Sequence, residues 1–269
     1  QISLVINTIF ASYLQSGSIT WMYYADRMTE LPTGVLGVAL GTILLPTLSK
    51  YAGGRNPREF SKLLDWGLRL CCLLAAPAAL GLAMLSFPLI ATMFMNKGFT
   101  LNDAVMTKNA LIACSFCVVG QIMIKVLAPA FYAQQNIKTP VKVAVFSLIV
   151  TQLMNIAFIV PLKHVGLSLS VGLGACLNAA LLLTLLRLKG LYQPDAGWRR
   201  FLTKLAIALA VMCFGLWAAQ SFMPMQWTDI RGWQKALQLG WLVLLGITLY
   251  FTSLALLGFR PRDFKRSEV

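Results

Sequence analysis

The sequence predicts an all-α, polytopic transmembrane helical bundle of about eight spans. Its 269 residues are 58% hydrophobic and only 12% charged, with a mean hydropathy of +0.72. Soluble domains are about 45–50% apolar and about 25% charged. Apolar runs close to the roughly 20 residues that a spanning helix needs recur along the whole chain. Proline, glycine and clusters of charge separate these runs, as expected for the connections between spans.

The breaks between the apolar runs place the elements. We expect spans at 2–14 (shortened at its start), 21–49, 60–87, 104–130, 141–160, 166–186, 201–222 and 233–257. Pro77 should kink the third span, and 88–103 should form a loop with a short apolar helix. The chain divides into membrane helices in 1–190, the last two spans in 191–259 and a basic tail at 260–269. It starts at Gln1 without an initiator Met or the features of a signal peptide, so we expect it to be part of a longer protein.

The basic residues between the spans indicate the orientation. One set of connections carries most of them: Lys50, Arg55, Arg58, Lys62, Lys138, Lys142, Arg187, Lys189, Arg199, Arg200, Lys204, Arg260, Arg262, Lys265 and Arg266. The opposite set carries Lys97, Lys163, Arg231 and Lys235. Cytoplasmic loops are enriched in Lys and Arg, so we expect a cytoplasmic C-terminus and place Trp21 toward the outer face.

Several functional classes find no support in the residues. The net charge of +14 sits between apolar runs rather than on the soluble basic face that nucleic-acid binding requires. The six cysteines lie within apolar runs, where Cys behaves as a small buried hydrophobe. Cys114 and Cys117 lack the second pair or partner His of a metal motif, and His164 has no catalytic partner. We therefore expect no enzyme, no metal, no cofactor and no nucleic-acid partner.

Asp26, Arg27 and Glu30 are the most informative charges. Asp26 and Glu30 are four residues apart and Arg27 and Glu30 are three apart, so on a helix the three side chains can reach one another. Charge at membrane depth is costly and is usually retained where it faces a bundle interior or a watery cavity. We interpret Arg27 as an anion-binding residue held in place by the two acids. The alternative is a structural ion-pair cluster at the interface, with Trp21 and its neighbouring tyrosines as an aromatic belt.

Polar residues deeper in the spans have simpler explanations. Lys125, with Gln121 one helical turn away, is expected to snorkel to the cytoplasmic interface in preference to a role in a cavity. Asn155 should form hydrogen bonds between helices, with a possible cavity role as the alternative. The last two spans contain almost no charge, so they can offer an apolar groove to a lipid. A charged cavity beside an apolar groove is suited to an amphiphilic substrate.

Three stretches carry a resemblance to a known family. These are residues 1–48, the segment LAPAFYAQQNIKTPVK at 127–142 and the segment GLGACLNA at 172–179. They resemble the MurJ/MviN lipid II flippases of Gram-negative bacteria, members of the multidrug/oligosaccharidyl-lipid/polysaccharide exporter superfamily. The likeness covers essentially the whole chain, which looks like the carboxy-terminal lobe and the two helices that extend it.

The resemblance implies a function. It implies a multi-pass protein of the bacterial inner membrane that moves lipid II, the undecaprenyl-pyrophosphate-linked peptidoglycan precursor, from the inner to the outer leaflet by alternating access. Arg27 matches the family's cavity arginine, Asp26 and Glu30 match acids beside it, and the last two helices match the pair that forms a groove for the lipid tail. The amino-terminal half of the protein would be the partner lobe, and membrane lipids would surround both.

The resemblance also leaves open points. Some members bind sodium through carboxylates where this chain has Asn7, Gln152 and Asn155, so we expect no sodium site. The alternatives are an exporter of another lipid-linked oligosaccharide or of drugs, and a membrane scaffold that transports nothing.

Overall fold

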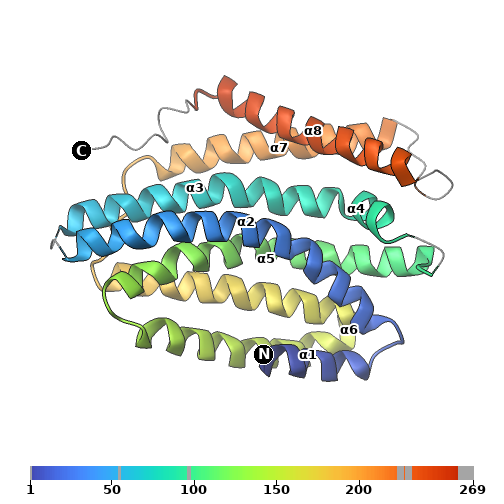
Figure 1. The fold of residues 1–269 in the computed structure, drawn as a ribbon, viewed down its shortest axis with the longest axis horizontal. Coiled ribbons are helices and arrows are strands. Elements are labelled where there is room, and N and C mark those ends of the chain that lie inside the picture. The colour runs from blue at the N-terminus through green and yellow to red at the C-terminus, as the bar shows by residue number, and fades with distance from the viewer. Residues whose placement is uncertain (1, 54–55, 96–97, 223–226, 228–231, 260–269) are drawn as a thin grey trace.

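The computed structural model describes residues 2–53, 56–95, 98–222, 227 and 232–259, and every regular element in these ranges is a helix (Figure 1). The elements are α1 (Ile2–Ser12), α2 (Ser18–Gly53), α3 (Pro57–Met84), α4 (Ser86–Met93), α5 (Leu101–Ala133), α6 (Lys138–Leu188), α7 (Trp198–Phe222) and α8 (Gly232–Leu256).

The predicted bundle of about eight spans is confirmed. Six of the described helices are long and apolar enough to cross a membrane. One of them, α6, is two spans, because the chain reverses at Lys163 (φ 52°, ψ −132°) and the two arms run side by side in Figure 1. α1 has 11 residues, fewer than the roughly 20 that a span requires. The short apolar helix expected within 88–103 is α4, which begins slightly earlier, at Ser86.

The connections alternate between the two ends of the bundle. The α2–α3, α5–α6 and α6–α7 connections all lie at the left end in Figure 1, and α8 also ends toward that side. This is the end to which the sequence assigns the larger set of basic residues. Arg55, Lys97, Arg231 and the predicted tail 260–269 lie outside the described residues.

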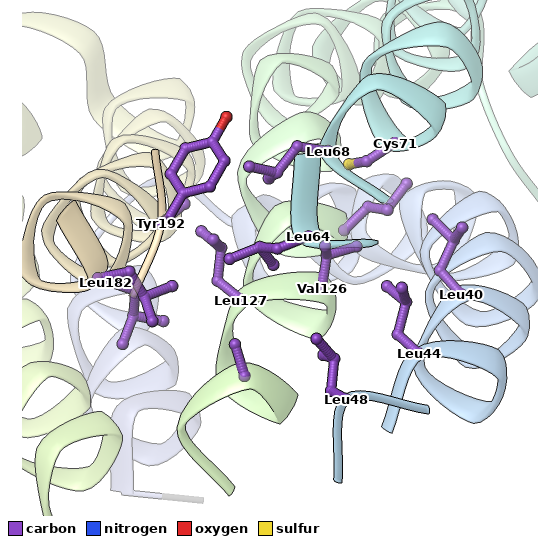
Figure 2. Close-up of a cluster of buried hydrophobic side chains, with 14 of the residues drawn as sticks. Leu40, Leu44, Leu48, Leu64, Leu68, Cys71, Val126, Leu127, Leu182 and Tyr192 are labelled. Carbon is purple, nitrogen blue, oxygen red and sulfur yellow. The ribbon is translucent and has the colours of Figure 1, made fainter. Parts of the chain in front are cut away.

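The main core lies between α2, α3, α5 and the second arm of α6. Figure 2 shows leucines of α2 and α3 meeting Val126 and Leu127 of α5, with Leu182 of α6 at the other side. Leu44, Leu64 and Leu127 are fully buried. Because these helices are apolar over most of their circumference, buried leucines decide how they pack and outward-facing ones are left for lipid.

Asp65 holds the α6–α7 connection against α3. Its side chain is buried, and its two oxygens accept from Arg69 Nε (2.7 Å), Tyr192 Oη (2.8 Å) and Trp198 Nε1 (2.6 Å). Burial and the nearby carboxylate raise the pKa of Tyr192 well above its usual value, so its hydroxyl stays protonated and donates. A buried charge is tolerated when it is paired and fully hydrogen-bonded, and Asp65 meets this condition.

α7 and α8 form a pair that packs on α3 and α4. Their shared apolar core includes Leu205, Met212 and Leu242. The Tyr250 hydroxyl donates to the carbonyl of Leu73 on α3 at 2.6 Å. This places the last two spans along α3, away from α1 and α6 (Figure 1).

Glycines allow two close helix contacts. A Cβ at Gly120 of α5 would lie 2.8 Å from the backbone N of Cys176 on α6, and Gly172 faces the Cys117 side chain at 3.0 Å. Small residues permit such approach in membrane helices. A Cβ at Gly34, in contrast, would have no neighbouring atom within 4 Å, so this glycine marks no contact.

Lys125 does not snorkel, and that prediction was wrong. Its Nζ donates to the carbonyl of Thr33, in the middle of α2, at 2.9 Å. Side chains on a helix lean toward the helix N-terminus, which for α5 is the end opposite to the basic connections. Gly37 leaves the space, because a Cβ there would overlap Lys125 Cδ. Lys125 therefore bridges α5 and α2 while part of its side chain stays exposed.

We expect Gly120→Ala to destabilise the fold by about 1–3 kcal/mol, the usual cost of overpacking, because its Cβ would meet backbone atoms that cannot turn aside. Thermal unfolding in detergent measures this. Gly240→Ala on α8, with no atom near its Cβ position, is the matched control. Equal melting temperatures for the two variants would contradict the close contact.

We expect Gly37→Ala to push the flexible Lys125 side chain off the Thr33 carbonyl and to cost about 1 kcal/mol, the net worth of one hydrogen bond. It should cost nothing once Lys125 is replaced by Ala, because the added methyl then enters empty space. A double-mutant cycle on unfolding free energies measures the coupling. Strictly additive effects would show that Lys125 and Gly37 do not share this space.

Candidate functional site

Arg27 lies on the exposed side of α2, where its own helix holds it. Its Nε donates to the Tyr23 hydroxyl at 3.1 Å, and its Nη1 donates to Glu30 Oε2 at 2.8 Å. The guanidinium carbon also lies 5.1 Å from the centre of the Tyr23 ring. The Arg27 and Glu30 side chains remain 54% and 62% exposed. The pair orients the guanidinium without sealing it, and Nη2 has no hydrogen-bond partner in the described chain.

Asp26 does not contribute to this pair. Its Oδ1 accepts from the Cys114 thiol of α5 at 3.5 Å. Successive residues on a helix point roughly 100° apart, so Asp26 turns toward α5 while Arg27 turns outward. The prediction that both acids hold Arg27 was therefore right for Glu30 and wrong for Asp26.

The hypothesis that Trp21 belongs to an interfacial aromatic belt is wrong. Its side chain is only 2% exposed, and its Nε1 donates to Asp103 Oδ1 of α5 at 2.8 Å. The His164 ring packs edge-on against it, with ring centroids 5.1 Å apart. Trp21 thus joins α2, α5 and the reversal of α6, whereas Tyr23 is the aromatic residue that is exposed beside Arg27.

A cavity of about 480 Å³ opens beside Arg27. Among the residues that line it, Arg27 is the one with a charge. The other lining residues are almost all apolar and come from α2, α3, α7, α8 and the region of α4: Met28, Leu31, Pro32, Leu74, Pro77, Ala78, Gly81, Leu82, Leu85, Leu89, Met93, Met212, Leu216, Val243, Gly246, Ile247, Tyr250 and Phe251. The cavity therefore joins a cation to the surface of both final spans.

The bend of α2 helps to shape this cavity. α2 bends partway along its length in Figure 1, and Pro32 is inside the helix. Proline has no N–H to bond the carbonyl four residues earlier and clashes with it, which bends a helix. Pro32 and Met28 both line the cavity, so the bend lies at the cavity wall.

The other candidate polar residues lie elsewhere. Lys125 bonds to Thr33, as described above, and neither it nor Gln121 lines the cavity. Asn155 is fully buried and donates to Asn7 Oδ1 (2.8 Å) and to Gln152 Oε1 (3.0 Å). This amide cluster joins α1 to the first arm of α6, as expected for hydrogen bonds between membrane helices.

Sequence reasoning missed the contribution of α3 and α4 to the cavity. Pro77 was predicted as a kink, yet it also lines the wall together with Ala78 and Gly81. A proline and small residues within one stretch of a spanning helix were the available signal, since they leave space next to a neighbouring helix. Leu89 and Met93 of α4 carry no comparable signal.

Comparison with known proteins agrees with this architecture. The family model described as "Lipid II flippase MurJ" matches residues 1–231. A lipid II flippase MurJ from Burkholderia cenocepacia is 48% identical over 99% of this chain and 52% of its own length. A probable lipid II flippase MurJ from Vibrio cholerae is 37% identical over 98% of this chain and 50% of its own length.

A solved structure has the same fold. It is described as lipid II flippase MurJ in an inward closed conformation, and it matches with a TM-score of 0.79 and 22% identity over 99% of this chain and 52% of that chain. The chain thus spans about half the length of the relatives it matches. With a family model covering residues 1–231, the chain belongs to the MurJ family of lipid II flippases.

Proposed function

We propose that this chain forms the carboxy-terminal half of a flippase that moves lipid II from the inner to the outer leaflet of the bacterial inner membrane. The observation that supports this proposal best is the cavity beside Arg27, whose lining combines this cation with apolar residues of α7 and α8. Lipid II carries its head group on an undecaprenyl diphosphate, so it needs a cation for the diphosphate and an apolar surface for the tail. The whole protein would supply the opposite lobe from its amino-terminal half.

Arg27 is the proposed contact to the diphosphate. A guanidinium presents a planar fork of donors that matches phosphate oxygens. Tyr23 accepts from Nε and Glu30 accepts from Nη1, which leaves Nη2 of Arg27 for the ligand. Glu30 would thus serve as a positioning residue. Asp26 would act indirectly, by holding α2 against α5 through Cys114.

The undecaprenyl tail would lie along α7 and α8, with the tail groove formed by 191–259 and the lobe by 1–190. The wall between Pro77 and Tyr250 is apolar and gains from contact with a hydrocarbon chain. Alternating access would then come from rocking of the two lobes. The positive-inside rule supports a cytoplasmic C-terminus.

The lining of the cavity argues against one of the alternatives. Export of cationic drugs would favour an acidic lining, but the charged group on the described lining is Arg27. Another lipid-linked oligosaccharide would use the same surfaces. Lipid II accessibility at the outer surface, measured while the full-length protein is depleted, separates a lipid II flippase from the other two classes. It should fall for a lipid II flippase and stay constant for a scaffold or for an exporter of something else.

We expect Arg27→Ala in the full-length protein to lower transport at least tenfold and to fail to support growth. Loss of a charged hydrogen bond to phosphate costs roughly 1.5–3 kcal/mol. Arg27→Lys should be intermediate, because it keeps the charge and loses the fork. Arg58→Ala, at the exposed start of α3, is the control. Normal growth with Arg27→Ala at normal membrane levels would rule out this role.

We expect Ala78→Phe to block transport while leaving Arg27 in place, because its ring would fill part of the cavity against α8. Ala210→Phe, on an exposed face of α7 outside the lining, is the matched control and should transport normally. The measurement is lipid II accessibility at the outer surface. Equal activity of the two variants would show that the tail does not use this cavity.

A further inference from the structure

A second pocket lies at the start of α7 and the end of α8, at the end of the bundle that carries the basic connections. It has a volume of about 270 Å³ and is lined by Arg69, Gly197, Arg200, Phe201, Lys204, Gly258 and Phe259. None of these residues lines the Arg27 cavity. The pocket therefore calls for its own explanation.

Three cations converge on this pocket, and one is partly neutralised. Arg69 pairs with Asp65 through Nε at 2.7 Å and donates from Nη2 to the carbonyl of Ala196 at 3.3 Å. None of the ion pairs in the described ranges involves Arg200 or Lys204. Asp65 neutralises Arg69, so the charges of Arg200 and Lys204 remain. A bound anion would offset this excess of positive charge.

Aromatic rings give the pocket an apolar floor. The Phe201 and Phe259 rings meet edge to face, with centroids 5.7 Å apart. Lys204 Nζ lies 5.4 Å from the Phe259 centroid, and the guanidinium of Arg69 lies 5.9 Å from that of Phe201. Cation–π contacts with these rings hold Lys204 and Arg69 against the apolar part of the pocket.

The surroundings indicate a lipid rather than a soluble anion. Leu202 of α7 and Leu256 of α8 are 47% and 88% exposed beside the pocket. Acyl chains can thus lie on exposed leucines while a phosphate enters the basic pocket. Basic pockets between helices on the cytoplasmic side suit lipid head groups.

We propose that Arg200, Lys204 and Arg69 bind the phosphate of an anionic phospholipid in the leaflet at this end of the bundle. The lipid would rest against the α7–α8 pair and tie it to α3 through Arg69. This site is separate from the proposed lipid II site, because the two pockets share no lining residue.

The test measures binding to the purified full-length protein by native mass spectrometry. The probes are phosphatidylglycerol, phosphatidylcholine and inorganic phosphate. The double variant Arg200→Gln/Lys204→Gln should lose phosphatidylglycerol affinity about 25-fold, at about fivefold (about 1 kcal/mol) for each cation near an anionic surface. Arg200→Gln alone removes one exposed side chain and should lose about fivefold.

The control pair is Arg199→Gln/Arg58→Gln, which removes the same charge at the same end of the bundle from residues outside the pocket. It should stay within twofold of the natural protein. Equal losses of affinity in both pairs of variants would mean general surface attraction and would overturn the site.

Phosphatidylcholine bound as tightly as phosphatidylglycerol would overturn the requirement for an anion. Inorganic phosphate bound as tightly as the lipid would overturn the assignment to a lipid. Arg27→Ala should bind phosphatidylglycerol normally, so this result is independent of the transport prediction.

Discussion

Both pockets depend on the hydrogen bonds that the buried carboxylate of Asp65 accepts. It joins α3 to the α6–α7 connection through Tyr192 and to the start of α7 through Trp198. It also fixes Arg69, which lines the basic pocket. A buried ion pair is weak evidence of stability in itself, because desolvation offsets much of the attraction. Its directional bonds nevertheless define where α7 meets α3, and so where the last two spans can stand.

Most of the fold could be predicted from the sequence because its signals are local. Each span is a continuous apolar stretch, and each break is a few residues of Pro, Gly or charge, so the reversal of α6 near Lys163 was already visible in 161–166. The pair formed by Arg27 and Glu30 was predictable for the same reason, since it is an i,i+3 contact. Local rules place elements well, and they place contacts within one element nearly as well.

Contacts between distant helices could not be predicted in this way. The partner of Asp26 is 88 positions away and that of Lys125 is 92, and no periodicity encodes either separation. Trp21 was misread because a buried aromatic residue near a helix start has the same local sequence as one in an interfacial belt. The cavity wall from α3 and α4 is made of ordinary apolar residues, which become informative only once α8 is known to face them.

The two ends of the α7–α8 pair are held by different forces. Near Asp65 the pair is held by directional hydrogen bonds to a charge, and the Arg69 side chain adds a bond to Ala196. Around the Arg27 cavity, α3 and the pair meet through apolar surfaces and through two single hydrogen bonds, from the Tyr250 hydroxyl to the Leu73 carbonyl (2.6 Å) and from the Gln220 amide to the Met84 carbonyl (3.3 Å). Apolar attraction depends on buried area and has little directional preference. A hydrocarbon guest can therefore replace one apolar surface with another along the cavity wall, whereas separating the helices there would also break these two hydrogen bonds. Because several hydrogen bonds converge on one charge near Asp65 and only single ones join the helices at the cavity, we expect the basic end of the pair to be the more firmly fixed of the two.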